Sequence, residues 1–418
     1  MVFPSGPRGW SRSLRRAAWA LLMVGSAWAQ EDADGTMLSF EEAWQRVQDR
    51  SPVLKAASMA QAAAQGGLRQ SEAYANPELS VTVEDTRPAT RTTTVLLSQP
   101  LELGGQRAAR QAAAQAAVAV QTAAAESRRH ELRAQTLLAY HAVQVAQERL
   151  RLSQDTLQAA ERAAQAAGLR VSAGRIPPLE GSRARVAAST ARLAQDQAQA
   201  LWLQRWRELG ALWGADAATV PARVQPLPLP TEPPSLSQLQ DRLQTAPTLL
   251  EGRQGVEQLR AQARLEQTRS WGIPALSMGI KRDASQPGHQ WVLGVSLPLP
   301  LLDRNQGQIT QAQHLADQAE ALLEARRTEL WTTLVNTQEQ LRTRLKELDV
   351  LNSEVLPLAE SAYQAASLGF EKGKFSFLEV LDAQRTLSDV REQVLAARLQ
   401  AAQASAELER LVGPLLHP

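Results

Sequence analysis

Residues 98–110, SQPLELGGQRAAR, decide the fold, because a strand gives way to a helix there. The residues just before, Val-Leu-Leu at 95–97, favour a strand, and the Ala, Gln and Arg tract that follows favours a long helix. We expect Pro100 to end strand pairing and to open the helix. Gly104 and Gly105 are expected to allow a tight bend at this junction.

The same junction returns later in the chain, which indicates an internal duplication. Matching landmarks are Ser98-x-Pro100-Leu101 with Ser296-x-Pro298-Leu299 (296 − 98 = 198), Gly174 and Leu179-Glu180 with Gly373 and Leu378-Glu379 (373 − 174 = 199), and Leu212-x-Gly214 with Leu411-x-Gly413. We therefore predict two repeats, 30–214 and 237–413, and a short tail, 414–418. The Pro-rich segment 215–236 is predicted to be a stiff linker. Pro300 is a further proline of the second junction.

Each repeat has the same predicted order of elements. A helix (Phe40 to about Tyr74; Ser237 to about Trp271) precedes a β-hairpin (about 76–99; about 275–297), a very long helix (about 106–168; about 307–368), a turn (about 169–179; about 369–378) and a last helix. Apolar residues of the long helices recur at coiled-coil spacings, as in Leu132, Ala139, Val143, Ala146 and Leu150. About 60 helical residues extend about 90 Å. The predicted class is mainly α with a small β part, built as rods.

The predicted strands alternate between apolar and polar residues. Leu79, Val81 and Val83 alternate with polar residues in the first hairpin, and Leu276, Met278 and Ile280 mark the second. This pattern is typical of a membrane-spanning β-strand, although a surface hairpin packed on a helix would also produce it. Four strands cannot close a barrel, and open sheet edges are not tolerated in hydrocarbon. A barrel would therefore have to be shared between subunits.

The N-terminus has the features of an export signal. Arg12, Arg15 and Arg16 precede an apolar stretch, and Ala27-Trp28-Ala29 is a small-x-small cleavage site, so residues 1–29 are predicted to be a signal peptide. A membrane anchor is the alternative, but the stretch is short of the ~20 residues a spanning helix needs. The arginine pair leaves the choice between the general and the twin-arginine export routes open.

The amino-acid composition excludes several kinds of bond and site, and it gives no support for nucleic-acid binding. The net charge of +2 gives no argument for nucleic-acid binding, and aromatic residues make up only 4% of the 418 residues. The chain has no cysteine, which excludes disulfides, thiolate metal sites and lipid attachment through an N-terminal cysteine.

The signal peptide, the duplicated unit and the SQPLELGGQRAAR junction together resemble the TolC family of outer-membrane efflux channels, most closely its CzcC/CusC-like heavy-metal branch. The resemblance implies a homotrimer with a shared 12-stranded β-barrel in the outer membrane of a Gram-negative bacterium and an α-helical barrel in the periplasm. It also implies a periplasmic adaptor (membrane fusion protein) and an inner-membrane RND-type pump. The chain would be the passive exit duct, with heavy-metal cations as the expected cargo and outer-membrane lipid around the strands.

The two turns would then form the periplasmic mouth. In the family the second turn reads G-x-x-x-x-x-[DE]-x-x-[DE]-A, which Gly373, Glu379, Asp382 and Ala383 match. The resemblance implies that Glu379 and Asp382 form carboxylate rings, with Glu180 at the equivalent place in the first turn. Where a family member has a gating arginine, this chain has Phe375. The remaining candidates are gate cations (Lys374, Arg183, Arg385) and adaptor-contact residues (Gly174, Arg175, Gly373, Lys374, Phe375).

No motif indicates an enzyme. His130 and His141 are about 16 Å apart along one helix, too far to share a metal, and no phosphate-binding loop, nucleophile elbow or HExxH occurs. Trp202, Trp206 and Trp213 have helical spacing, which is more typical of packing than of ligand binding. We predict no catalysis, no cofactor and no metal site. Two rivals remain: a TolC-type channel for drugs or other solutes, and a periplasmic coiled-coil adaptor or scaffold.

Overall fold

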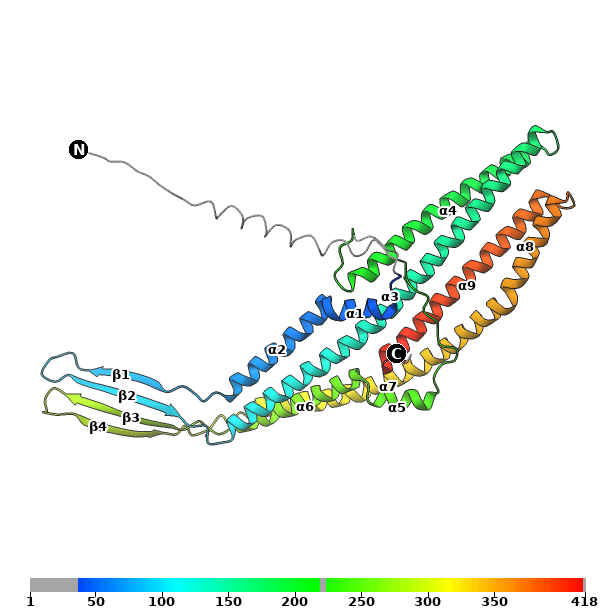
Figure 1. Cartoon of the computed structure of the whole chain (residues 1–418). Helices are drawn as coiled ribbons and strands as arrows, with labels where there is room; N and C mark the ends of the chain where they lie inside the picture. The colour runs from blue at the N-terminus through cyan, green and yellow to red at the C-terminus, as the bar shows by residue number, and fades with distance from the viewer. Residues whose placement is uncertain (1–36, 219–222, 416–418) are drawn as a thin grey trace, which may run out of the picture.

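The computed structural model describes residues 37–218 and 223–415. The predicted signal peptide and the last three residues of the tail lie outside this part of the chain. Figure 1 shows an elongated molecule with a sheet at one end and the tips of two helical hairpins at the other. Among the helices of the described residues, none is long and apolar enough to cross a membrane.

Both halves of the chain contain the same elements in the same order. The first half contains α1 (Phe40–Arg50), α2 (Pro52–Glu72), β1 (Glu78–Glu84), β2 (Thr92–Pro100), α3 (Gln106–Ser172) and α4 (Pro178–Ala211). The second contains α5 (Leu236–Gln244), α6 (Pro247–Thr268), β3 (Ala275–Asp283), β4 (Gln290–Ser296), α7 (Gln306–Val350), a π-helical turn (Leu351–Val355), α8 (Leu356–Glu371) and α9 (Phe377–Val412). The predicted fold class, mainly helical with a duplicated unit, is confirmed. The predicted domain boundaries stay a prediction.

The first helix of each repeat was expected to be continuous, and that expectation is wrong. Ser51 is extended and ends α1, and Pro52 starts α2; in the second repeat Ala246 is extended before Pro247. A residue that precedes proline is pushed out of the helical region by the proline ring. Each predicted helix is therefore a short helix followed by a longer one.

The second long helix also differs from its prediction, because Leu351–Val355 form a π-helical turn just before Pro357. Such a turn widens a helix locally. At the junctions before this turn the repeats are 198 residues apart, as Pro100 and Pro298 show (298 − 100). After it they are 199 apart, as the matching ion pairs Glu161–Arg192 and Glu360–Arg391 show (391 − 192). The wide turn lies where the second repeat gains one residue.

The prolines of the junction do not open the helices, contrary to the prediction. Pro100 is the last residue of β2 and lies opposite Ala275, and α3 begins only at Gln106. Pro298 and Pro300 lie in the link between β4 and α7. The helices start instead after Gly105 and Asn305, which both have positive φ, at 76° and 60°.

The four strands form one antiparallel sheet in the order β1-β2-β3-β4. Paired residues of antiparallel strands share a face. One face carries apolar rows that cross the sheet: Val81, Val95, Ile280 and Trp291 in one row, and Leu79, Leu97, Met278 and Leu293 in the next. The opposite face carries polar rows such as Thr82, Thr94, Lys281 and Gln290. The alternation predicted from the sequence therefore aligns across both repeats.

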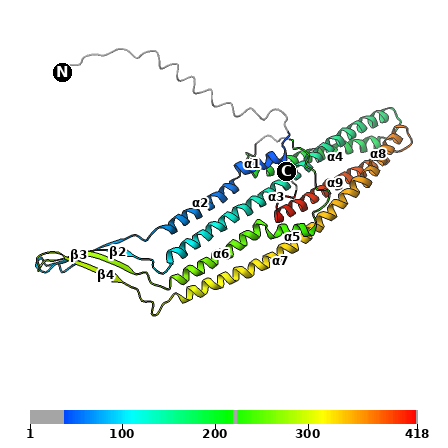
Figure 2. The same ribbon diagram turned by 60° about the horizontal axis from the view of Figure 1, so that its bottom comes forward.

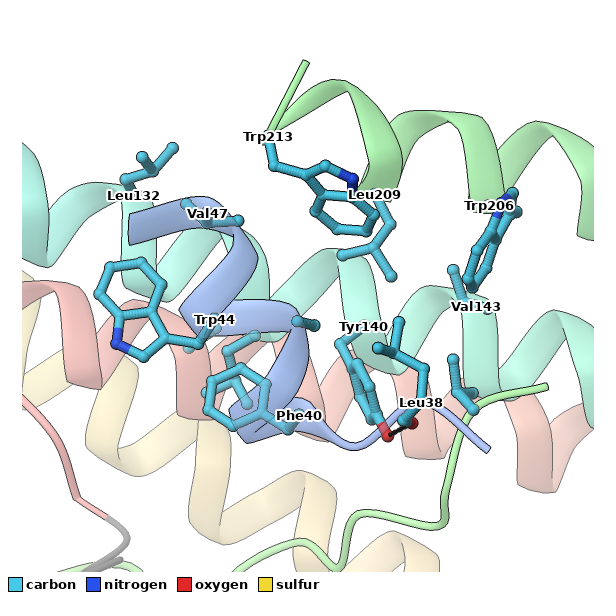
Figure 3. Packing of buried hydrophobic residues seen from close by; sticks show 14 residues of the cluster. Leu38, Phe40, Trp44, Val47, Leu132, Tyr140, Val143, Trp206, Leu209 and Trp213 are labelled. Carbon is cyan, nitrogen blue, oxygen red and sulfur yellow. Dashed lines mark hydrogen bonds between the residues drawn. The ribbon is translucent and has the colours of Figure 1, made fainter. Parts of the chain in front are cut away.

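The largest apolar cluster surrounds the middle of α3, where α1 and the end of α4 pack (Figure 3). Trp206 and Trp213 are buried in it, so they are packing residues, and Trp202 lies against its edge. The buried Tyr140 hydroxyl lies 2.8 and 2.9 Å from the carbonyls of Leu38 and Gln225, and its one proton is shared between these two acceptors. This contact fastens the linker and the segment before α1 to α3, at mid-height between the sheet and the hairpin tips.

Candidate functional site at the junction and the hairpin tips

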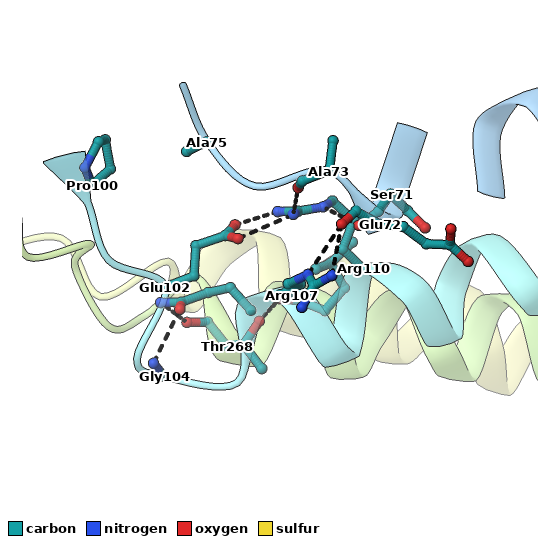
Figure 4. Close-up of polar contacts among 12 residues, drawn as sticks. Ser71, Glu72, Ala73, Ala75, Pro100, Glu102, Gly104, Arg107, Arg110 and Thr268 are labelled. Atoms are coloured by element: carbon teal, nitrogen blue, oxygen red, sulfur yellow. Dashed lines mark hydrogen bonds and ion pairs between the residues drawn. The ribbon is translucent and has the colours of Figure 1, made fainter. Parts of the chain in front are cut away.

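At the first strand-to-helix junction, two arginines of α3 donate hydrogen bonds to carbonyls at the C-terminal end of α2 (Figure 4). Arg107 donates to the Glu72 carbonyl, and its guanidinium lies 3.9 Å from the centroid of the Tyr74 ring. Arg110 donates to the carbonyls of Ser71 and Ala73. The last carbonyls of a helix have no partner within the helix, so these guanidinium groups satisfy acceptors that would otherwise be unpaired.

Arg110 also pairs with Glu102, whose side chain is largely buried. The hydrogen bonds from Arg110 lower the pKa of the Glu102 carboxyl below its ordinary value, because they stabilise its charged form. Gln106 donates to the carbonyls of Thr268 and Trp271 at the end of α6, so this junction also binds the second repeat. Among the predicted junction residues, Gly105 has φ +76°, and a side chain at Gly104 would meet that of Gln106.

The second junction uses other residues for the same purpose. Asn305 donates to the Glu266 carbonyl and to its carboxylate, and Arg269 pairs with that carboxylate at 2.7 Å. Asn305 is the residue directly before α7, as Gly105 is directly before α3. In each junction, carbonyls near the end of the preceding helix thus accept a hydrogen bond from a side chain. The donor is a guanidinium in the first junction and an amide in the second.

At the far end, both hairpin turns have the same backbone geometry. Gly174 and Gly373 have φ of +66° and +72°, a conformation that favours glycine. The next residue donates back to the helix in each turn, Arg175 to the Arg170 carbonyl and Lys374 to the Gly369 carbonyl, at 2.9 and 2.8 Å. The predicted turn residues therefore lie together at the tips.

The predicted carboxylates differ in what binds them. Glu379 is the third residue of α9, and its carboxylate accepts hydrogen bonds from the backbone N–H and the hydroxyl of Ser376, at 2.6 and 3.0 Å. Together with the bond from the Glu379 N–H to the Ser376 hydroxyl, this is a capping box. Asp382 is exposed one turn further on. Glu180 has the corresponding position in α4, where Pro177 precedes the helix and no side chain caps it.

The capping role of Glu379 was not predicted, although S-x-x-E at 376–379 is a sequence signal for a helix start. The predicted gate cations Lys374, Arg183 and Arg385 are exposed, and none of them forms an ion pair with a side chain that the structure describes. In this conformation the structure does not bring them to the carboxylates.

The two tips are joined instead by a cation–π contact and by apolar packing, neither of which was predicted from the sequence. Arg170 of α3 lies 4.4 Å from the centroid of the Phe370 ring of α8. Phe370 and Leu381 also pack against the buried Ala167 and Ala184 of the first hairpin. Phe375 covers Gly369 so closely that a Cβ there would lie 2.1 Å from the ring. Only the tertiary structure places these residues from both hairpins together.

Histidines and carboxylates do not gather into a metal site within the described residues: no group of three potential ligands occurs there. His141 of α3 is buried, and burial lowers the pKa of its imidazole to about 4, with the charge of Arg398 in α9 adding to the effect. Partial burial also lowers the pKa of His130. Both histidines therefore favour the neutral form.

Comparison with known proteins agrees with this geometry. The profile of the outer membrane efflux protein family matches residues 43–215 and 238–414, one segment in each half of the chain. The chain is 36% identical to the cobalt-zinc-cadmium resistance protein CzcC of Cupriavidus metallidurans over 362 residues, which are 86% of either chain.

Solved structures show the same fold at low sequence identity. A membrane protein of Pseudomonas aeruginosa superposes with a TM-score of 0.76 at 21% identity, covering 90% of both chains. CusC gives 0.73 at 18%, covering 90% of this chain and 92% of its own. VceC of Vibrio cholerae gives 0.72 at 17%, covering 90% and 96%. With these matches, the predicted resemblance is confirmed: the chain belongs to the outer membrane efflux protein family and acts as an outer-membrane channel protein of an efflux system.

Proposed function

We propose that three copies of this chain form the exit duct of a tripartite pump for heavy-metal cations, fed by an inner-membrane RND-type pump through a periplasmic adaptor. The sheet supports this proposal most directly. Its apolar face is exposed in the single chain, with Trp291 and Leu293 at 74% and 75% exposure. An exposed apolar face of this size is suited to lipid.

The edges of the sheet support assembly from several copies. Within the described residues β1 and β4 each pair on one side only, so both edges carry free backbone groups. Hydrocarbon does not tolerate such edges. Pairing β4 of one copy with β1 of the next removes them, and three four-stranded sheets give the 12 strands of the proposed barrel.

The tips supply the proposed periplasmic mouth. Asp382 and Glu379 project from the first turns of α9, and threefold repetition would place three copies of each around the axis. We propose Glu180, Glu379 and Asp382 as the cation-selecting carboxylates, and the turns with Gly174, Arg175, Gly373, Lys374 and Phe375 as the adaptor contacts. Lys374, Arg183 and Arg385 are proposed as cations that pair with carboxylates when the mouth changes conformation.

The cargo is proposed from the relative. CzcC is described as a cobalt-zinc-cadmium resistance protein. We infer that this chain passes similar divalent cations passively, catalyses no reaction and holds no cofactor. Carboxylate rings suit cations in general, so the partner pump would choose among them.

The proposal is tested by conductance of the purified protein in a planar bilayer, with Cd²⁺ or Zn²⁺ added on the periplasmic side. We expect a cation-selective current in the wild type, blocked by these ions. Glu379→Gln/Asp382→Asn should weaken the block by about tenfold, the scale of a lost electrostatic site of roughly 1.4 kcal/mol. Glutamine is chosen because it can keep the capping box while removing the charge.

Ser376→Ala is the matched control, since it weakens the cap and leaves both carboxylates in place. A block that is unchanged by the double substitution would contradict the carboxylate sites but not the channel. A folded protein that never conducts would contradict the channel itself. Conductance combined with normal Cd²⁺ and Zn²⁺ accumulation in cells that lack the chain would favour other solutes as cargo.

A further inference from the structure

The face of the sheet that carries the apolar rows, here called the apolar face, ends in two arginines. They lie near the β1–β2 and β3–β4 turns, at the end of the molecule opposite the hairpin tips (Figure 1). Arg282 follows Ile280 by two residues in β3, so it shares the apolar face, and it pairs with Thr93 of β2. Arg91 precedes Thr93 by two residues, and its carbonyl accepts from the Ala284 N–H at 3.0 Å, which continues the pairing. The two arginines are therefore diagonal neighbours on one face.

Neither arginine has an anionic partner in the part of the chain that the structure describes. Both side chains are exposed, and no ion pair joins Arg91 or Arg282 to a described carboxylate. The carboxylate of the adjacent turn, Asp85, pairs with Arg87 at 2.6 Å. Diagonal neighbours on a sheet are within reach of each other when their side chains are long. Two like charges at that separation repel, so an anion between them would be stabilised.

At this end of the sheet, the charges are divided between the two faces. Glu84, Thr92 and Asp283 form one row of the polar face, which would line the inside of the proposed barrel. Lys281 belongs to the same face, two residues before Asp283. The two guanidinium groups lie at this height on the opposite face. Charges that only kept the turns soluble would not have to be sorted in this way.

The two ends of the apolar face also differ. Among the residues of β1 to β4 on this face, Arg282 is the only charged one. Towards the helices the face ends with the row of Gln99, Leu276 and Val295, and the exposed Leu297 follows β4. Positive charge therefore lies only at the end that would face the cell exterior.

The arginines lie just beyond the apolar band. Trp291 belongs to the last apolar row, with Ile280, and tryptophan is enriched where hydrocarbon meets the headgroups. The Arg282 row is about 7 Å further along the strand, which is the level of the headgroups. Because β2 and β3 are the central strands of the sheet, pairing with other copies through β1 and β4 would leave this place uncovered.

We propose that Arg91 and Arg282 together bind a phosphate group of the lipid that forms the outer leaflet of the outer membrane. This inference rests on the proposed function, because it needs the apolar face to lie against the membrane. The outer leaflet of a Gram-negative outer membrane contains lipid A, which carries phosphate groups. Guanidinium groups suit this partner, because each donates parallel hydrogen bonds to two phosphate oxygens.

Native mass spectrometry of the purified protein in detergent tests the proposal, since it shows the assembly and the bound lipid together. The protein is titrated with lipid A that carries both phosphates. We expect Arg91→Gln/Arg282→Gln to weaken binding at least about tenfold, because the charged contacts to phosphate are lost. The matched control, Arg87→Gln/Lys281→Gln, removes the same charge from the same end of the sheet. It should stay within about twofold of the wild type, because Arg87 pairs with Asp85 and Lys281 lies on the polar face.

Two further probes separate the source of the phosphate. Lipid A without its phosphates should bind the wild type at least about tenfold more weakly than the phosphorylated form. Inorganic phosphate in large excess should not displace the bound lipid, because the acyl chains also bind the apolar rows. Displacement by inorganic phosphate would contradict a lipid site.

Equal losses in the two double variants would overturn the inference, because binding would then depend on charge alone and not on its place on the apolar face. Equal binding of lipid A with and without phosphates would overturn it as well. The same spectra distinguish these failures from a failure of the proposed function. A trimer with either result contradicts only the lipid site, whereas a wild type that never assembles as a trimer contradicts the proposed function and this inference with it.

Discussion

At the first strand-to-helix junction two arginines, Arg107 and Arg110, close the end of α2, whereas at the second junction Asn305 closes the end of α6. At the sequence spacing of 198 that relates Pro100 to Pro298, Arg110 corresponds to Gln308, an exposed residue without any hydrogen bond to a described side chain. The requirement is common to both, because unpaired carbonyls at a helix end must find donors. Both repeats therefore supply hydrogen-bond donors to the carbonyls at the helix ends, but the residues that donate differ between the repeats.

In the middle and at the tips of the hairpins, matching positions also carry different residues. Buried His141 of α3 corresponds to exposed Glu339 of α7 at the spacing of 198. Ser376, the cap of α9, corresponds to Pro177, which offers α4 no side-chain cap. At these matching positions the first repeat has the buried histidine, and the second repeat has the side-chain cap.

Breaking the first junction should have the largest effect. Arg110→Ala leaves Glu102 without its cation and the carbonyls of Ser71 and Ala73 without donors. Since the pair is only partly buried, we expect a loss of about 2–3 kcal/mol in the free energy of unfolding, measured by urea denaturation in detergent. Gln308→Ala at the matching position should change it by less than about 0.5 kcal/mol. Equal losses in the two variants would contradict the difference between the junctions.

The effect of His141 on the pH dependence of stability should differ from that of Glu339, its counterpart in α7. The folded-state pKa of His141 is lowered to about 4, so between the ordinary value near 6.5 and pH 4 the unfolded chain binds a proton that the folded chain does not. Stability should therefore fall as the pH drops through this window, by about 2 kcal/mol at pH 5. The thermal midpoint of His141→Gln should fall less steeply with acid than that of the wild type. Glu339→Gln is the matched control and should keep the wild-type slope in this window.

Changes at the tips should have the smallest effects. Ser376→Ala removes a helix cap and should cost about 1 kcal/mol, whereas Glu379→Gln should cost little, because glutamine can complete the capping box. Pro177→Ser would create S-x-x-E with Glu180 and should stabilise the first tip by about 0.5 kcal/mol. Amide hydrogen exchange in the first turns of α4 and α9 would measure both changes. No gain of protection in α4 would show that the first tip lacks the geometry for a cap.

Much of the architecture could be predicted from local patterns. The alternation around Val81 and Ile280 and the glycines at 174 and 373 predicted strands and turns that the structure contains. Helix starts were predicted less well, because proline was expected to open the helices that begin at Gln106 and Gln306. Those starts depend on a positive-φ residue and on side chains that reach another element, which no local pattern encodes.

The sequence by itself predicted the export signal, and it determined the duplication, the length of the helical rods, and strands with one apolar and one polar face. Each of these follows from residue type and spacing along the chain. Only the tertiary structure decided which cations are paired. Arg110, Arg133, Arg149 and Arg170 bind groups of other elements, while the predicted gate cations Arg183 and Arg385 are exposed at the tips. An arginine is equally charged at every position, and its partner is set by how distant helices pack. The physical reason is that ion pairing depends on separation in space, which the spacing of residues fixes only within one helix.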